Sequence, residues 1–424
     1  MIATLNRTSG DAAAVPPLSS SGCELADIFR QYGQAYRQTH RLGRAQRKAM
    51  WDIEHCRTET LGGYRERCPA CGYEREAFRS CRNRNCPKCQ SMATAAWVAA
   101  RQAELLPVPY FHLVFTLPHE LNALILYSEG NLRTLLDLLF DATSRTLSTF
   151  GREHLGGKAG FVLVLHTWDQ RLRAHFHVHG LMASGALSPD GTRWIAGGRD
   201  FLFPVHGLSK MFRGKYLDGV ARLLGEGDLD LPPQLEALRD TDHRRHWLRQ
   251  CGKKSWVVYA QAPFAGPRKL VDYLGRYTHR TAIGNQRIVR CEGGQVTFRY
   301  RDRADGDREK FETLPVDEFL DRFLQHVLPS GFFRVRHYGL LANCVKRKLL
   351  PHCRRLVGAV PHPRLADGPR TAAEWMQHLL GIDVTRCPCC GGDLEREPLA
   401  ARDPLADAPY APYPDRKLEP WNTS

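Results

Sequence analysis

The 424-residue chain lacks the features that would place it in a membrane or outside the cell. No stretch approaches roughly eighteen consecutive apolar residues, so the sequence predicts no transmembrane helix. The first residues, which include Asp11 and the Pro16-Pro17 pair, lack the charged-then-apolar order of a signal peptide. Without a secretion signal, the 14 cysteines are expected to bind metal rather than to form disulfides, and we expect a cytoplasmic protein.

Acidic residues are also scarce relative to basic ones. Asp and Glu number 45 against 60 Lys and Arg, which gives a formal net charge of +15. The excess is spread along the sequence rather than gathered in one tail, which favours a polyanionic partner, most commonly nucleic acid. A basic protein without such a partner is the alternative that charge alone leaves open.

Hydrophobic residues make up 43% of the chain, enough for substantial cores in two or three domains. Composition shifts predict four segments. We expect a disordered N-terminus at 1–22 and a helical, four-cysteine zinc-binding domain at 23–107. We then expect a strand-rich domain at 108–330 and a basic helical region at 331–424, which ends in a cysteine knuckle and a disordered tail.

The middle of the chain has the pattern of an antiparallel sheet. Residues 110–117, 161–168 and 175–182 are strand candidates, and a polar connection of a few residues joins the last two as a hairpin. Two further strand candidates flank Glu292-Gly-Gly-Gln295. With helical sequence before and after them, these strands predict an α+β fold.

Two Cys-x-x-Cys pairs separated by fourteen residues form the strongest metal motif. Two such pairs supply the four thiolates of a closed tetrahedral site, which is typical of structural Zn²⁺. The predicted ligands are Cys68, Cys71, Cys86 and Cys89. Basic side chains between or beside them are candidates for contacts with DNA phosphates, namely Arg82, Arg84 and Lys88.

Other cysteines have less certain partners in the sequence. For Cys56 and Cys81 we favour buried thiols over a second metal site with His55. Cys387 and Cys390 have the spacing of half a second zinc site. The candidates to complete that site are His352 and Cys353.

The run from His175 to Met182 reads as a strand with three imidazoles on one face, those of His175, His177 and His179. A hairpin register centred near 171–172 pairs His166 with His177, and directly opposed residues share a face. We therefore predict a divalent metal site at His166, His177 and His179, with His175 in reserve and His112 as a further competitor. A core strand with satisfied imidazoles is the alternative, and three on one face make it the weaker one.

Two tyrosines at a spacing of four, Tyr273 and Tyr277, share one face of a predicted short helix. A tyrosine nucleophile needs help to lose its proton, and Arg276 and Arg280 supply positive charge nearby. An aromatic core stripe would show the same spacing. Beside the histidine strand, we favour tyrosine nucleophiles with the two arginines in contact with DNA.

Together these features resemble the HUH superfamily of single-strand DNA nucleases, here as His177-Val-His179. Within it the chain is most similar to rolling-circle insertion-sequence transposases of the two-tyrosine type with an N-terminal zinc-binding domain. The resemblance extends over about residues 50–395. It rests on Ser80-Cys-Arg-Asn-Arg-Asn-Cys-Pro-Lys-Cys89, Phe111-His-Leu-Val-Phe-Thr-Leu-Pro-His119, Leu208-Ser-Lys-Met-Phe-Arg-Gly-Lys215, Tyr273-Leu-Gly-Arg-Tyr-Thr-His-Arg280 and Arg336-His-Tyr-Gly-Leu-Leu-Ala-Asn343.

The resemblance implies a transposase that nicks and rejoins single-stranded DNA at transposon ends and target through a 5′-phosphotyrosine. Mg²⁺ or Mn²⁺ on the histidines would polarise the phosphate, and structural Zn²⁺ would hold the cysteine head. It implies Tyr277 as first nucleophile and Tyr273 as second, and location in the bacterial cytoplasm with the nucleoid. Asn85 stands where this family pattern leads us to expect histidine, and the cysteine ligands are all present.

Three other functions compete with this one. A plasmid replication initiator or conjugative relaxase of the same superfamily would share the histidines and tyrosines, but not the cysteine head. A non-enzymatic zinc-containing DNA-binding regulator would explain the charge and cysteines only. A metallohydrolase would want a carboxylate near the His-x-His pair, for which Asp169 is the candidate.

Overall fold

The computed structural model describes residues 23–261, 268, 269, 271, 272, 275, 281–359, 369 and 371–401. These residues form helices and antiparallel sheets, and the predicted α+β class is confirmed. None of the helices described in these ranges is long and apolar enough to cross a membrane. Short 3-10 turns connect the larger elements at Glu59–Leu61, His119–Leu121, Pro233–Arg239, Asn285–Arg287 and Arg303–Asp305.

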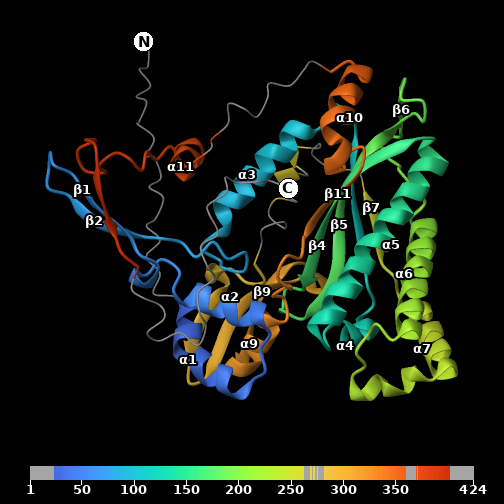
Figure 1. Ribbon diagram of the computed structural model, residues 1–424, viewed down its shortest axis with the longest axis horizontal. Coiled ribbons are helices and arrows are strands. Elements are labelled where there is room, and N and C mark those ends of the chain that lie inside the picture. The colour runs from blue at the N-terminus through green and yellow to red at the C-terminus, as the bar shows by residue number, and fades with distance from the viewer. Residues whose placement is uncertain are drawn as a thin grey trace, which may run out of the picture.

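A six-stranded antiparallel sheet lies at the centre of the molecule (Figure 1). Its order is β11-β4-β5-β3-β7, with β6 paired to β5. The strands are β3 (Tyr110–Thr116), β4 (Lys158–Trp168), β5 (Ala174–Leu187), β6 (Trp194–Ala196), β7 (Val258–Gln261) and β11 (Val335–Gly339). The predicted hairpin is therefore β4–β5, and its strands extend further than the sequence pattern indicated.

One face of this sheet is covered by helices and forms the main core (Figure 1). Alternate residues point to it, such as Phe115 on β3, Leu163 on β4 and Val178 on β5. The covering helices are α4 (Asn122–Ile125), α5 (Glu129–Leu155), α6 (Val205–Glu226) and α7 (Thr241–Lys253). The backbone of α5 begins where Ser128 accepts a hydrogen bond from the Asn131 amide and ends at left-handed Gly156.

The opposite face of the sheet packs against α3 (Gln90–Glu104) and α10 (Asn343–Leu356). Val164, Leu181 and Trp97 belong to this smaller core. Because side chains alternate across a strand, the even-numbered positions of β4 and the odd-numbered positions 177, 179 and 181 of β5 share this face. The histidine side chains are thus turned away from the α5–α6 layer.

A second core joins the N-terminal helices to a separate three-stranded sheet. Phe29 and Met50 pack there with Phe298, Phe319 and Phe323. The elements are α1 (Leu25–Thr39), α2 (Arg44–Glu54), β8 (Ile288–Glu292), β9 (Gln295–Asp302), β10 (Arg308–Pro315) and α9 (Val316–Leu324). The predicted hairpin at 292–295 is β8–β9, and this core spans both sides of the domain boundary expected at 107.

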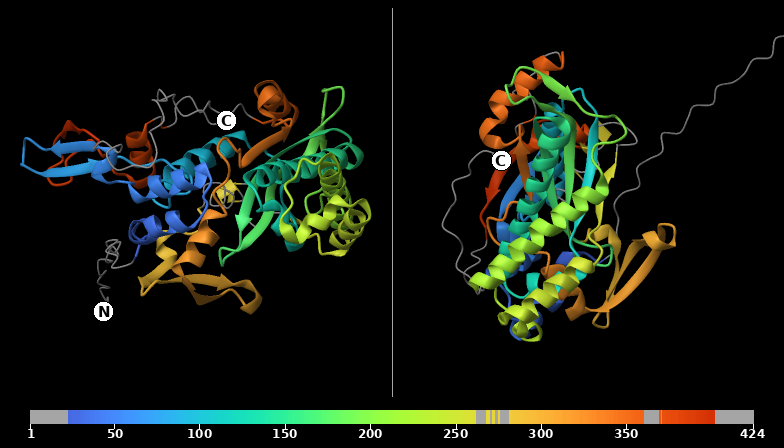
Figure 2. Two further views of the ribbon diagram at one scale, coloured as in Figure 1. Left: turned by 60° about the horizontal axis from the view of Figure 1, so that its bottom comes forward. Right: turned by 90° about the vertical axis from the view of Figure 1, so that its right-hand side faces the viewer.

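A narrow three-stranded ribbon extends from the body (Figure 2). It pairs β1 (Gly63–Arg67) with β2 (Glu74–Phe78) on one side and with β12 (Glu395–Leu399) on the other. Helix α11 (Ala372–Leu380) precedes β12 and contacts α3. Two segments more than three hundred residues apart in sequence therefore share one small sheet.

Candidate active site and thiolate clusters

Three buried histidines meet on the α3–α10 face of the β4–β5 hairpin. The strand register pairs His166 with His177, as the hairpin prediction required, and His179 lies two residues further along β5, opposite Val164. One ligand atom from each residue lies within 4.8 Å of the others, and His166 Nδ1 is 3.2 Å from His177 Nε2. The structure does not include His175 in this group. The geometry is that of a three-imidazole site open to a divalent ion.

Neighbouring groups orient two of the imidazoles. His177 Nδ1 donates to the carbonyl of His175 at 2.9 Å, which leaves the lone pair on Nε2 available to a metal ion. His179 Nδ1 lies 2.9 Å from Nε2 of His112, and the two rings are parallel, with an interplanar angle of 5°. His112, a competitor for the third ligand position in the sequence, therefore lies behind His179 as a positioning residue.

Burial keeps the imidazoles of His112, His177 and His179 neutral. Desolvation, followed by the charge of His175, lowers the pKa of His177 to about 3. Desolvation likewise lowers the pKa of His112 to about 4 and holds that of His179 well below its usual value. Neutral imidazoles present lone pairs rather than protons at physiological pH, which is the state that a metal ligand requires.

No carboxylate joins the histidine group in the described part of the chain. Asp169, the carboxylate considered for a metallohydrolase, accepts hydrogen bonds from the backbone of Arg171 and Arg173 and forms an ion pair with Arg173 at 2.7 Å. It closes the β4–β5 turn. The donor set is therefore nitrogen only, which does not favour the metallohydrolase alternative.

The predicted nucleophiles Tyr273 and Tyr277 lie outside the described residues, as do Arg276 and Arg280. Their described neighbours lie on the histidine-bearing side of the sheet: Val271 is buried in the core beneath α3 and α10. Asp272 accepts a hydrogen bond from Gln102 of α3 at 2.6 Å. A Cβ on Gly275 would be 2.1 Å from Val98 of α3, so this position requires glycine.

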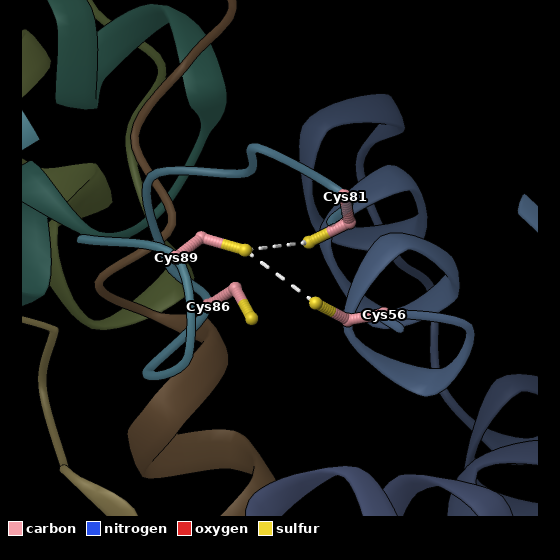
Figure 3. A group of neighbouring side chains, drawn as sticks. All are labelled: Cys56, Cys81, Cys86 and Cys89. Carbon is pink, nitrogen blue, oxygen red and sulfur yellow. Dashed lines mark hydrogen bonds between the residues drawn. The ribbon is translucent and has the colours of Figure 1, made fainter. Parts of the chain in front are cut away.

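Four cysteines converge where α2 ends and α3 begins (Figure 3). Cys56 Sγ is 3.4 Å from Cys89 Sγ, and Cys81 Sγ is 3.7 Å from Cys89 Sγ; Cys86 completes the group. Hydrogen bonds, first from Cys81 and then from Cys86, lower the pKa of Cys56 to about 7. Four thiols at these separations match a tetrahedral zinc site.

A second group of four thiols lies at the end of the ribbon away from the body, at the β1–β2 turn. Cys68 Sγ is 3.5 Å from Cys390 Sγ, and Cys71 Sγ is 3.6 Å from Cys387 Sγ. All four ligand atoms lie within 4.8 Å of one another. One pair comes from the β1–β2 turn and the other from the turn before β12.

These groups correct the predicted ligand set. The structure does not bring the pair Cys68 and Cys71 together with Cys86 and Cys89, because the β1–β2 hairpin carries the first pair outward while the second remains at the start of α3. Cys56 and Cys81, which the sequence suggested were buried thiols outside any site, belong to the inner cluster.

The sequence also suggested incorrect partners for the outer thiols and for Cys56. His352 Nε2 bonds to the Gly191 carbonyl instead of facing Cys387, and Cys353 is buried in the core beneath α10. His55 stacks on Trp51 and lies outside both thiol groups.

The three basic side chains predicted to contact DNA beside the zinc ligands differ from one another in their surroundings. Arg84 donates to the carbonyls of Leu328, Pro329 and Phe332, and burial lowers its pKa. It therefore holds the chain after α9 rather than facing solvent. Lys88 forms an ion pair with Glu24. Arg82 is exposed, and of these three cations it is the best placed for a phosphate.

His326 contacts the β4–β5 hairpin near its turn. It is 4% exposed, its Nδ1 is 3.2 Å from Thr167 Oγ1, and its Nε2 is 3.0 Å from the Leu172 carbonyl. Burial lowers its pKa from 6.5 to about 4, against the opposing effect of the Leu172 hydrogen bond. Between these pH values the unfolded chain binds a proton that the folded chain does not. The stability that His326 contributes is present above pH 6.5 and is lost as the pH falls towards 4.

We expect His326→Gln to make the protein less sensitive to acid. Glutamine can retain the hydrogen bond to Leu172 but takes up no proton. Between about pH 7.5 and pH 5 the free energy of unfolding should fall by about 2 kcal/mol less in the variant than in the wild type. Denaturant unfolding of both proteins at both pH values gives this double difference, in which proton effects at the thiolates cancel. An equal loss in both proteins would contradict the assignment.

The fold and the site define a protein that combines two features. An antiparallel sheet carries a histidine hairpin suited to a metal ion, and a cysteine-rich N-terminal region precedes that sheet. Comparison with known proteins agrees. Residues 28–117 match the family described as "Transposase zinc-binding domain", and residues 160–348 match the family described as "Putative transposase".

Two relatives cover most of the chain. "Putative transposase y4qJ" of Sinorhizobium fredii is 47% identical over 88% of this chain and 94% of its own length. The "Transposase for insertion sequence element IS801" of Pseudomonas savastanoi pv. phaseolicola is 30% identical over 79% of each chain. The chain belongs to this family of rolling-circle insertion-sequence transposases with an N-terminal zinc-binding domain.

Among solved structures, the chain is similar to the conjugative relaxase TrwC in complex with oriT DNA, in metal-free and copper-bound forms. The identity is 13% in both cases, and the TM-scores are 0.22 and 0.21. The matches cover 40% and 39% of this chain and 72% and 68% of the relaxase chains.

Proposed function

We propose that this transposase cuts and rejoins single-stranded DNA at the ends of its element through a 5′-phosphotyrosine, with Tyr277 as first nucleophile and Tyr273 as second. The observation that carries the proposal is the buried trio of His166, His177 and His179. A DNA-binding protein without strand-cutting activity would have no need of three buried imidazoles whose ligand atoms lie close together.

The residues present fit a divalent cation. Three buried imidazoles converge, and contacts with the His175 carbonyl and with His112 fix the orientation of two of them. Between Mg²⁺ and Mn²⁺, a donor set made only of nitrogen favours Mn²⁺, since Mg²⁺ prefers oxygen ligands. When bound, the ion supplies positive charge that polarises the scissile phosphate and stabilises the charge developing on it.

The remaining chemistry belongs to the chain and the DNA. The Tyr277 oxygen attacks phosphorus, the bond between phosphorus and the 3′ oxygen breaks, and the phenol proton passes to solvent while the leaving oxygen takes up a proton. The products are a 5′-phosphotyrosine and a 3′-hydroxyl. One phosphodiester is exchanged for another, so attack by a 3′-hydroxyl on the adduct rejoins a strand without ATP.

We propose that basic side chains bind the phosphates of the single strand. We propose phosphate contacts from Arg82, which is exposed beside the inner thiols, and from Arg276 and Arg280 beside the tyrosines. We also propose that Cys56, Cys81, Cys86 and Cys89 hold the zinc of the N-terminal domain, where their thiols lie together.

Replacing Tyr277 tests the nucleophile. Wild-type protein mixed with a labelled single-stranded oligonucleotide from an end of its element and Mn²⁺ should form a covalent adduct that survives SDS. Tyr277→Phe should lower adduct formation at least about a hundredfold, because the ring stays and only the attacking oxygen is lost. Gel electrophoresis of the labelled strand measures the adduct.

Tyr127→Phe is the matched control, since Tyr127 is exposed in the connection between α4 and α5, on the other side of the sheet from the histidines. It should form adduct at the wild-type rate. Normal adduct formation by the Tyr273→Phe/Tyr277→Phe double variant would refute the mechanism.

A further inference from the structure

We propose that the outer thiol cluster is a second structural zinc site, a clip that fastens the C-terminal part of the chain to the N-terminal ribbon. Its ligands are Cys68, Cys71, Cys387 and Cys390. The domain family matched at residues 28–117 contains only the first two. The clip does not depend on the proposed strand-transfer chemistry.

The two halves of the clip have the same backbone conformation. The Gly72 amide donates to the Cys68 carbonyl at 2.9 Å, and the Gly391 amide donates to the Cys387 carbonyl at 2.9 Å. Gly72 and Gly391 have φ values of 72° and 74°, where glycine is favoured. Each Cys-x-x-Cys-Gly turn therefore points both of its sulfurs the same way.

Further backbone contacts close each turn. The Cys68 amide donates to the Tyr73 carbonyl at 2.8 Å, and the Cys387 amide donates to the Gly392 carbonyl at 2.7 Å. The Cys389 amide points at Cys387 Sγ from 3.4 Å, a contact that favours a thiolate at that sulfur. Two matching turns, face to face with four sulfurs between them, are the geometry of a closed tetrathiolate site.

The ribbon has little else to hold it. Most side chains of β1, β2 and β12 are exposed, and the outer strands add no buried residue. Its main internal contact is Glu66, 3% exposed, which accepts from Arg75 on β2 at 2.5 Å and from Arg396 on β12 at 2.8 Å. A sheet this small and polar needs a metal to be stable, because it buries too little apolar surface.

The clip links distant parts of the transposase. Cys71 and Cys387 are 316 residues apart in sequence. Between the second pair of thiols and the body lies α11, which contacts α3, the helix that also contacts the described neighbours of the tyrosines. Zinc at this site would thus keep the C-terminal segment seated against the helix that supports the active-site face.

The test counts metal in purified full-length protein by mass spectrometry. Wild type should hold two zinc ions per chain. Replacement of either outer pair by serine should leave one, and replacement of both outer pairs should still leave one, because the pairs share an ion. Combining any of these changes with Cys86→Ser/Cys89→Ser should leave no zinc bound to the thiol groups. The variants are Cys68→Ser/Cys71→Ser, Cys387→Ser/Cys390→Ser, their combination, and each with Cys86→Ser/Cys89→Ser.

Cys389→Ser is the matched control, because Cys389 is exposed and lies between two ligands but outside the cluster. It should retain two zinc ions. The clip is refuted if wild type holds one zinc, if iron replaces zinc at the outer site, or if Cys387→Ser/Cys390→Ser still holds two. A single zinc in wild type that survives Cys387→Ser/Cys390→Ser is the result expected if Cys68 and Cys71 shared an ion with Cys86 and Cys89. A folded inner site, seen as one retained zinc, excludes general unfolding as the cause.

Discussion

His179→Ala is expected to lower metal-dependent nicking of single-stranded DNA at least about a thousandfold. His179 is a 6% exposed member of the trio, and alanine removes its nitrogen ligand together with the ring nitrogen that His112 contacts. Two imidazoles would remain, too few to hold the ion at physiological concentrations. Initial rates with a labelled oligonucleotide and Mn²⁺ measure the loss, and Mn²⁺ titration followed by electron paramagnetic resonance measures the affinity directly.

His175→Ala is the control for this experiment. Its side chain is on the same strand but outside the ligand group, and alanine keeps the backbone carbonyl to which His177 Nδ1 donates. We expect Mn²⁺ affinity and nicking within a few-fold of the wild type. If His175→Ala loses Mn²⁺ while His166→Ala keeps it, the third ligand is the residue held in reserve on sequence grounds and the trio is wrongly assigned.

The hairpin could be predicted because its information is local. Alternation places His177 and His179 on one face, and the short polar connection fixes the register that pairs His166 with His177. Which face they occupy follows from the same alternation, since Phe176 and Val178 must enter the α5–α6 core. Local periodicity and turn chemistry therefore sufficed for this part of the site.

The thiol groups could not be predicted in the same way. The Cys-x-x-Cys spacing shows that Cys68 pairs with Cys71 and that Cys86 pairs with Cys89. It does not show which of these pairs share a metal ion. The structure joins the first pair to one 316 residues away, through strand pairing between β1 and β12. One signal was present in the sequence: Cys387 and Cys390 needed two partners, and Cys56 and Cys81 could complete a site at Cys86 and Cys89.

The sequence also did not show which distant segments of the chain would share a hydrophobic core. Helices α1 and α2 have ordinary amphipathic patterns, which predict a buried face but not its partner. Their partner is the sheet β8–β10 with α9, so residues near the N-terminus pack on residues beyond 280. Long-range pairing of this kind depends on tertiary contacts that no local pattern encodes.

That shared core explains why the inner thiol cluster should govern stability. Cys56 and Cys86 are each 1% exposed and belong to the same core as Phe29 and Phe319. Zinc at this point would bind α2 to the start of α3 inside the core. The free energy of a structural zinc site is folding free energy, since the unfolded chain does not preform the site.

Cys56→Ser is therefore expected to lower the midpoint of thermal unfolding by at least about 10 °C, which corresponds to several kcal/mol for a unit of this size. Cys251→Ser provides the comparison, because Cys251 is equally buried, at 2% exposure, in the α5–α6 core and outside both thiol groups. Its loss should cost about 1–2 kcal/mol and leave the zinc in place. A strong chelator should lower the midpoint of wild type and of Cys251→Ser but have much less effect on Cys56→Ser, whose inner site is already broken. If Cys56→Ser unfolds at the same temperature as Cys251→Ser and retains two zinc ions per chain, the inner cluster does not stabilise the fold, and the stability of this core comes from its aromatic side chains.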